Sequence, residues 1–132
     1  MIHQYDIVVV GGGIAGLYTA LTASELNCRV AVVSKVHVVR SHSVAAQGGI
    51  AASLGNEEED HWEWHMYDTV KGSDYLADQN AVEILTREAP NEILALEHMG
   101  VPFTRSVAGK IEQRETHRIS LDSHPTYNCL WK

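Results

Sequence analysis

The chain has 132 residues, of which 45% are hydrophobic, and this predicts one modest globular domain. Its formal net charge of −7, from 17 acidic and 10 basic residues, argues against nucleic acid as a partner. No apolar run reaches the roughly 20 residues that cross a membrane, and the N-terminus lacks the features of a secretion signal. Cys28 and Cys129 have no metal-like spacing, so we expect a reducing compartment such as the cytoplasm.

The beginning of the chain predicts a βαβ unit. Residues 5–13, YDIVVVGGG, contain a short β-branched run of the kind that forms a strand buried on both faces of a parallel sheet. A helix is expected from Ile14 to Leu26, ended by Asn27, because asparagine tolerates the left-handed conformation after a helix. A second buried strand is expected over 29–34. This order predicts a right-handed crossover and a Rossmann-like α/β fold.

A further helix is predicted over 61–71, with a capping box at its start. Asp60 would cap the first free N–H groups, while Glu63 reaches back. His61 and His65 are four residues apart on this helix, a spacing compatible with metal binding. The sequence supplies no third ligand to complete such a site, so both histidines are predicted to lie on the helix surface.

Two more helices and a pair of short strands are expected downstream. Residues 80–88 predict one helix, and Pro90 is expected to interrupt the pattern, because proline is not tolerated in a helix interior. Residues 91–99 predict the next helix, with Gly100 as its C-cap. Residues 101–105, VPFTR, predict a short strand, followed by a turn that leads into another.

The sequence VVVGGGIAG, between the first strand and the first helix, predicts a phosphate-binding turn. Gly11 permits the tight turn, and Gly13 has no Cβ that would keep the backbone away from a pyrophosphate. Gly16 lets the helix pack closely on the strand, so that the helix N-terminus faces the phosphates. The pattern is specific here because it has the correct strand–turn–helix context. The predicted cradle consists of Gly11, Gly12, Gly13, Ile14, Ala15 and Gly16.

The end of the second strand departs from the usual NAD-binding pattern. Such strands often end in Asp or Glu, which binds the ribose hydroxyls, whereas this one ends in Ser34 and Lys35. The segment RSHSVAAQGG, residues 40–49, follows shortly afterwards and has no clean hydrophobic period. A serine hydroxyl can still bond to a ribose, but the combination is atypical of ordinary NAD enzymes.

Several segments together carry a resemblance to a known family. They include VVVGGGIAGLYTAL, SKVHVVRSHSVAAQGGIAASLGN, HMYDTVKGSDYLADQ and LEHMGVPFTR. From Tyr5 to about Arg114 the chain resembles the flavoprotein subunit of succinate dehydrogenase and fumarate reductase. L-aspartate oxidase, a sister family, shares AQGGIAA but resembles the chain less around RSHS, because its members usually lack a histidine there.

The resemblance implies a set of FAD-binding residues in the segment that follows the second strand. In the family, the histidine of RSH is bonded covalently to the 8α-methyl carbon of FAD, and that residue is His42 here. An imidazole suits this role because its neutral form is nucleophilic. Ser41 and Ser43 match positions that hydrogen-bond the flavin or the phosphates. The remaining matches pack against the isoalloxazine (Gln47, Gly48 and Gly49) or lie near the adenosine ribose (Ser34 and Lys35).

The function that the resemblance implies is interconversion of succinate and fumarate, by hydride transfer to or from covalent FAD. Electrons would be exchanged with an iron–sulfur subunit, and membrane anchor subunits would hold the complex on the cytoplasmic face of the inner membrane. The family's catalytic residues match nothing in this chain, so we expect residues 1–114 to form the N-terminal, incomplete part of an FAD-binding domain. Residues 115–132 are a divergent tail. Two alternatives remain: an aspartate-oxidase-type flavoenzyme, and a truncated non-catalytic remnant that binds FAD weakly or not at all.

Overall fold

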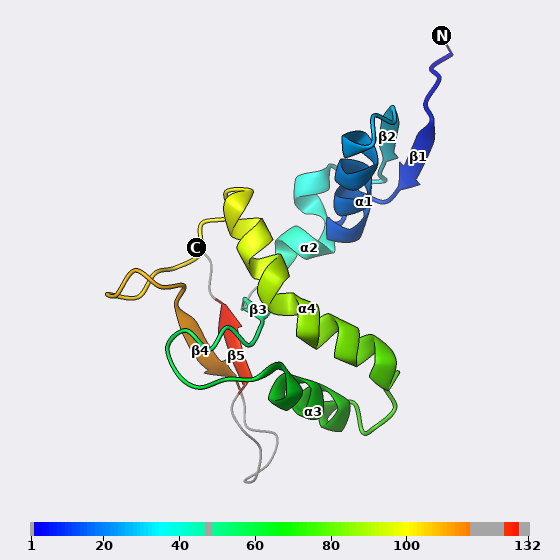
Figure 1. The fold of residues 1–132 in the computed structure, drawn as a ribbon. Helices are drawn as coiled ribbons and strands as arrows, with labels where there is room; N and C mark the ends of the chain where they lie inside the picture. The colour runs from blue at the N-terminus through cyan, green and yellow to red at the C-terminus, as the bar shows by residue number, and fades with distance from the viewer. Residues whose placement is uncertain (1, 47–48, 117–125, 130–132) are drawn as a thin grey trace. The chain divides into compact units, whose positions relative to one another are not determined.

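The computed structural model describes residues 2–46, 49–116 and 126–129 (Figure 1). The chain forms two compact units, Met1–Gln47 and Gly48–Lys132, hereafter the first and the second unit. The first contains a two-stranded parallel sheet, and the second a three-stranded antiparallel sheet.

The first unit has the βαβ arrangement that the sequence predicts. β1 (Ile7–Val10) and β2 (Val30–Val33) pair in parallel. Ile7 lies opposite Val30 at one end of the pair, and Val10 lies opposite Val33 at the other. α1 (Ile14–Glu25) connects them and packs on both strands. Asn27 follows the helix with a φ of 61°, so the prediction that an asparagine in the left-handed region ends α1 is confirmed.

The apolar residues of this unit are more exposed than those of a sheet covered on both faces. Val8 is 57% exposed and Val10 is 85% exposed. The expectation that these strands are buried on both faces is therefore wrong within the described residues. Each strand has only the other as its described partner, and a single crossover helix packs on one face of a sheet. Several apolar residues of α1 also remain exposed: Ile14, Leu17, Tyr18 and Leu21.

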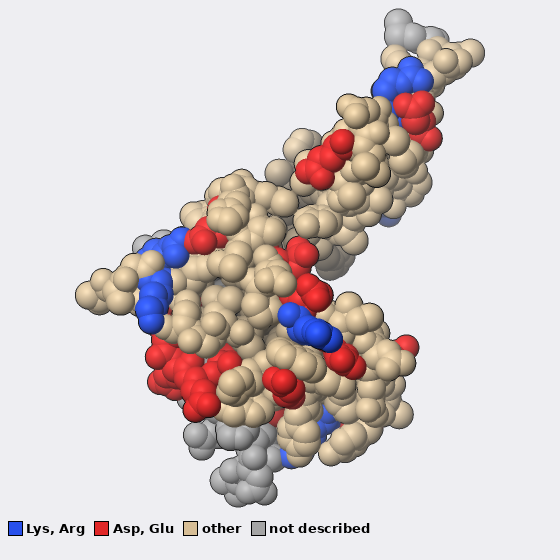
Figure 2. Space-filling view, in the orientation of Figure 1, with Lys and Arg blue, Asp and Glu red and all other residues tan. Residues whose placement is uncertain are grey.

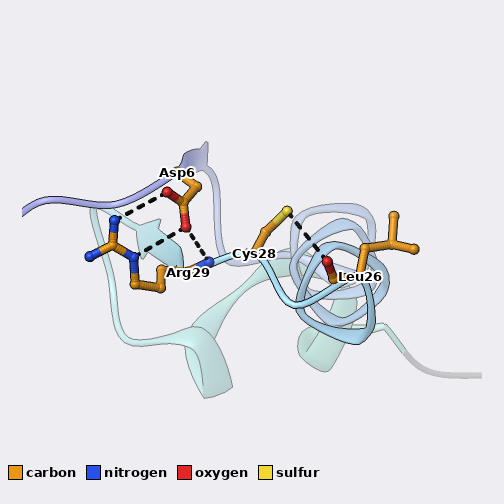
Figure 3. Close-up of polar contacts among 4 residues, drawn as sticks. All are labelled: Asp6, Leu26, Cys28 and Arg29. Carbon is orange, nitrogen blue, oxygen red and sulfur yellow. Dashed lines mark hydrogen bonds and ion pairs between the residues drawn. The ribbon is translucent and has the colours of Figure 1, made fainter.

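An ion pair joins the beginnings of the two strands (Figure 3). The Asp6 carboxylate accepts hydrogen bonds from the Arg29 backbone N–H at 2.8 Å and from two guanidinium nitrogens at 3.2 Å each. The side-chain hydrogen bonds from Arg29 hold the pKa of Asp6 below its ordinary value of 3.8. Because both side chains are exposed to solvent, the pair serves mainly to set where β1 meets β2.

The second unit contains two packed helices, a small sheet and a buried apolar cluster. α3 (Trp62–Gly72) and α4 (Gln79–His98) pack against each other. The strand order is β3-β5-β4, with β3 at Ile50–Ala51, β4 at Gln113–Thr116 and β5 at Thr126–Cys129. The cluster consists of Ala52, Ile93, Phe103 and Ile111.

α4 is one helix where the sequence predicts two. Pro90 lies inside it, so the predicted interruption at this residue is wrong. A proline in a helix interior costs roughly 3 kcal/mol, because it lacks an N–H and crowds the preceding turn. Thr86 and Ile93, one on each side of the proline, are 0% and 1% exposed, and this burial holds both halves in one helix. Asp78 caps the start, and Gly100, with a φ of 98°, follows the end as predicted.

The start of α3 differs from the predicted capping box. Its N-cap residue is His61, which makes no side-chain capping hydrogen bond, and Asp60 is buried one position earlier. His65 is only 5% exposed, so the prediction that both histidines lie on the helix surface is wrong for His65. The buried residues of α3 are largely polar, and they include Asp68 beside Val70. Burial lowers the pKa of His65, and the charge of Asp68 offsets this only in part.

The predicted strand over 101–105 is reduced to isolated bridges. Arg105 pairs with Ile111 across the turn at Gly109, which has a φ of 78°. The second predicted strand is present as β4, and the expected boundary at residue 114 falls inside it.

Candidate nucleotide-binding site

The turn after β1 has the backbone that a phosphate-binding loop requires. Gly11 has a φ of 121°, a conformation that residues with a Cβ rarely adopt. Its N–H donates to the Val33 carbonyl oxygen at 2.8 Å, which ties the turn to the end of β2. The turn therefore lies at the carboxyl ends of both strands, the edge where open α/β sheets bind their ligands.

Two of the glycines are required by the packing of the protein itself. A Cβ on Gly16 would lie 2.0 Å from the Gly11 carbonyl oxygen, so only glycine allows α1 to approach the turn this closely. A Cβ on Gly12 would lie 2.8 Å from Val38 Cγ1 and 3.0 Å from Ser34 Oγ. These contacts agree with the predicted role of Gly16 in close helix–strand packing.

Gly13 faces a different environment. It is the N-cap of α1 with an ordinary φ of −80°, and as a glycine it has no side chain that could cap the helix. The nearest atom to a Cβ at this position would be Ser43 Oγ, at 3.3 Å, rather than backbone. A side chain at Gly13 would therefore crowd Ser43 at the helix N-terminus, and glycine keeps this position free of one.

The first turn of α1 is suited to an anion. The first N–H groups of a helix have no partner inside the helix, and Ala15 and Gly16 belong to this turn. No acidic residue lies in the turn, so nothing there neutralises the positive end of the helix dipole. The Ile14 N–H donates to Ser43 Oγ at 3.1 Å.

The distribution of charge favours an anionic ligand in the first unit. This unit has two acidic and three basic residues, whereas the second has 15 acidic and seven basic residues. Acidic side chains accordingly gather on the visible face of the second unit (Figure 2). The first unit therefore has a formal net charge of +1 and the second of −8, so the overall net charge of −7 arises from the second unit.

The segment after β2 brings two of the other predicted residues, Ser34 and Ser43, next to this turn. Ser34 and Lys35 are exposed directly after β2. A short 3-10 helix, η1 (Val38–Arg40), leads into α2 (His42–Ala45). Ser41 is the N-cap of α2, and its Oγ is buried without a hydrogen-bond partner among the described residues.

His42 is the first residue of α2, and its side chain is exposed to solvent. Gln47 and Gly48 lie outside the described residues. Gly49 has a φ of 92° and lies next to β3 in the second unit. The structure thus brings together the glycine turn, Ser34 and Ser43, and it leaves the grouping of His42 with residues 47–49 a prediction.

Sequence reasoning misses one contributor to this site, Val38. Its Cγ1 lies where a Gly12 side chain would be, so it closes the turn from the side of η1. The available signal is an apolar pair, Val38 and Val39, within a short polar connection, which indicates that one of them packs inward.

These residues fit a dinucleotide cofactor. The turn offers backbone N–H groups and no side chain at Gly13, and Ser34 offers a hydroxyl at the end of β2 for a ribose. The buried Ser41 Oγ is a further polar atom that a ligand could satisfy. The fold and this site define a dinucleotide-binding βαβ unit.

The chain matches the family model for an FAD binding domain over residues 6–128, and it belongs to that family. It is 56% identical, over 112 residues, to the succinate dehydrogenase flavoprotein subunit of Rickettsia felis. This alignment covers 85% of the present chain and 19% of the Rickettsia protein. It is also 47% identical, over 116 residues, to the fumarate reductase flavoprotein subunit of Mycobacterium tuberculosis. That alignment covers 86% of the present chain and 20% of the Mycobacterium protein.

Solved structures give the same assignment. The Mycobacterium smegmatis Sdh1 complex in the apo form matches 98% of this chain and 21% of its own, with a TM-score of 0.84 and 37% identity. The Escherichia coli quinol fumarate reductase matches 86% of this chain and 19% of its own, with a TM-score of 0.78 and 39% identity. The resemblance to these flavoprotein subunits is confirmed, and the chain spans about a fifth of their length.

No helix among the described residues is both long and apolar enough to cross a bilayer.

Proposed function

We propose that this chain supplies the phosphate-binding part of the FAD site in a flavoprotein that interconverts succinate and fumarate. The observation that carries the proposal is the glycine turn, with a φ of 121° at Gly11, no side chain at Gly13 and an acid-free helix N-terminus behind it. The family match supports FAD as the cofactor, and the names of the relatives support succinate and fumarate as substrates. When bound, FAD supplies the ability to accept or return a hydride.

The predicted site residues would each hold one part of this cofactor. The backbone N–H groups of Gly13, Ala15 and Gly16 would bind the pyrophosphate, and the helix dipole would stabilise its charge. The Ser34 hydroxyl would bond to the ribose in place of the usual carboxylate. Lys35 and Ser41 would contribute beside them, while Gln47, Gly48 and Gly49 would pack against the flavin ring.

His42 would carry the covalent bond to FAD. Its exposed side chain is accessible to a cofactor, and it lies one residue from Ser43, which contacts the helix N-terminus. The test is a chimera in which residues 1–114 replace the matching segment of the Rickettsia felis subunit. After denaturing electrophoresis, flavin fluorescence should stay with the wild-type chimera and disappear in His42→Ser, which should still bind FAD non-covalently.

His37→Ser is the matched control, because His37 is an exposed histidine of the same unit and directly precedes η1. Its fluorescent band should match that of the parent chimera. A band that survives in His42→Ser would show that another residue is linked, and would favour a different attachment site.

The partners of the parent protein follow from the same proposal. Relatives named as flavoprotein subunits and as a complex support electron exchange with an iron–sulfur subunit. Anchor subunits would then keep the protein at the cytoplasmic face of the inner membrane. Co-purification of the chimera with the Rickettsia iron–sulfur subunit tests this, with a chimera lacking the grafted segment as the control.

A second candidate applies to the 132-residue chain on its own: a non-catalytic polypeptide that binds FAD weakly. The exposure of Val8 and Val10 in β1 favours it, because the strands of a parallel sheet are ordinarily covered on both faces. Purified chain should then hold little flavin and show no succinate–dye reductase activity. Stoichiometric FAD together with succinate oxidation would contradict this candidate and support a complete enzyme.

A further inference from the structure

Two contacts seat the segment after β2 on the glycine turn. The Ile14 N–H donates to Ser43 Oγ at 3.1 Å, although 29 residues separate them in the sequence. Val38 fills the space beside Gly12, where its Cγ1 would lie 2.8 Å from an added Cβ. The segment between Val38 and Ser43 is therefore fixed to the cradle at both of its ends.

The Ser43 hydroxyl has the chemistry to connect the helix N-terminus with a phosphate. A hydroxyl carries two acceptor lone pairs and one O–H donor. One lone pair receives the Ile14 N–H, and the O–H can be donated to a phosphate oxygen. Such a chain of hydrogen bonds strengthens each member, because each one polarises the next.

The helix that bears His42 depends on such an anchor. α2 has only four residues, His42–Ala45, and a helix this short is not stable by itself in water. Its N–H groups at Val44 and Ala45 donate back to the Ser41 carbonyl, which closes one turn and no more. The orientation of α2 is thus set by what holds its neighbouring residues, and Ser43 is the one in contact with α1.

We infer that Ser43 is a positioning residue that couples occupation of the phosphate cradle to the placement of His42. This inference rests on the proposed function, because it requires a diphosphate at the cradle. A phosphate that accepts the Ser43 O–H would pull this residue firmly onto the N-terminus of α1. His42, the preceding residue in the same helical turn, would be held with it.

The test uses the full 132-residue chain, labelled with nitrogen-15, and ADP as the diphosphate probe. Weak binding is sufficient, since amide shifts report it directly. In the wild type, the amide resonances of Ile14 and His42 should move along one common binding curve. In Ser43→Ala, the His42 shift should be lost, and the apparent affinity for ADP should fall about fivefold, the effect of one ordinary hydrogen bond.

Three further variants make the result specific. Ser43→Thr and Ser43→Val have the same bulk and differ in the hydroxyl, so only Ser43→Thr should keep the His42 response. This pair repeats the test even where Ser43→Ala disturbs the fold. Ser24→Ala, at the far end of α1, removes a hydroxyl that bonds only to the Leu21 carbonyl among the described residues, and it should behave as the wild type.

The outcomes separate this inference from the proposed function. If the His42 amide resonance shifts with added ADP as much in Ser43→Val as in the wild type, the inference is overturned, while the phosphate cradle stands. A wild-type chain in which ADP moves neither Gly13 nor Ile14 would contradict the cradle itself, and the inference with it. In the chimera, Ser43→Val should lower the covalently bound fraction of flavin more than the total bound flavin, and equal losses would count against a positioning role.

Discussion

The two units differ in where their chemistry and their stability lie. The first unit contains the glycine turn, Ser43 and His42, but its strands and α1 leave many apolar side chains exposed. The second unit contains the buried cluster around Ile93 and most of the acidic residues. The part with the clearest functional motif is therefore the part that packs least by itself. Motif residues are selected for contact with a ligand, whereas a core is selected for burial.

Truncation of the core of the second unit should have the largest effect. Ile93 is 1% exposed, so Ile93→Ala should lower the free energy of unfolding by about 2–5 kcal/mol, through lost burial and the cavity left behind. Leu94→Ala is the matched control on the same helix, because Leu94 is 46% exposed. Urea titration followed by tryptophan fluorescence measures both, since all three tryptophans belong to the second unit. Equal losses would mean that the cluster is not a core.

The buried carboxyl group of Asp60 should make the second unit less stable as the pH rises. Burial raises the pKa of Asp60 from 3.8 to about 6, and the nearby His61 N–H and Ser53 hydroxyl offset this only in part. The folded state then holds its proton more tightly than the unfolded state, so this contribution is fully present below about pH 4 and lost by about pH 7.

The loss should be at most about 3 kcal/mol, which is the pKa difference expressed as free energy. Asp60→Asn should flatten this part of the profile of unfolding free energy against pH, measured by urea titration. Glu59→Gln is the control, because Glu59 is exposed at the adjacent position. His65, whose pKa burial lowers, acts in the opposite sense, since its contribution is present above pH 6.5 and is lost as the pH falls below that value. If Asp60→Asn leaves the profile of unfolding free energy against pH unchanged, the pH dependence does not come from the Asp60 carboxyl group.

A side chain at Gly16 should disrupt the first unit alone. The added Cβ of Gly16→Ala would lie 2.0 Å from a backbone oxygen, so α1 must move away from the turn, at a cost of about 1–3 kcal/mol. Amide hydrogen exchange should speed up in β1 and α1, and stay unchanged in α3 and α4. Gly72→Ala, at the exposed end of α3, should leave the first unit unaffected. Faster exchange throughout the chain would show that the two units are energetically coupled.

The smallest effect is expected from the ion pair at the beginning of the sheet. Arg29→Gln should return the pKa of Asp6 toward 3.8, because the lowering comes first from the Arg29 side-chain hydrogen bonds. The carboxyl carbon resonance of Asp6, followed by NMR against pH, measures this directly. Thermal stability should change little, since the pair is exposed and screened by salt. A large fall in the thermal midpoint would contradict this expectation, because it would show that the exposed Asp6–Arg29 pair stabilises the first unit strongly.

Local signals in the sequence predict the first unit well and the second unit less well. The strand–turn–helix pattern, Asn27 at the helix end and the close approach at Gly16 are all decided within a few residues of one another. Besides the exposure of β1 and β2, the errors fall on the second unit, at α3, α4 and the strand expected over 101–105. Pro90 remains inside a helix because distant contacts bury both of its sides, and His65 is buried because α3 turns a polar face inward. Neither fact can be read from neighbouring residues.

The sequence by itself determined the βαβ order, the glycine turn and the family resemblance, because each depends on backbone conformations that only certain residues adopt. Tertiary structure alone decided which atoms meet across long separations. The Ile14 N–H reaches Ser43 Oγ, and Val38 lies against Gly12, because the chain returns along β2 to the turn that it left at β1. Such contacts are fixed by the path of the whole unit, so no short stretch of sequence contains them.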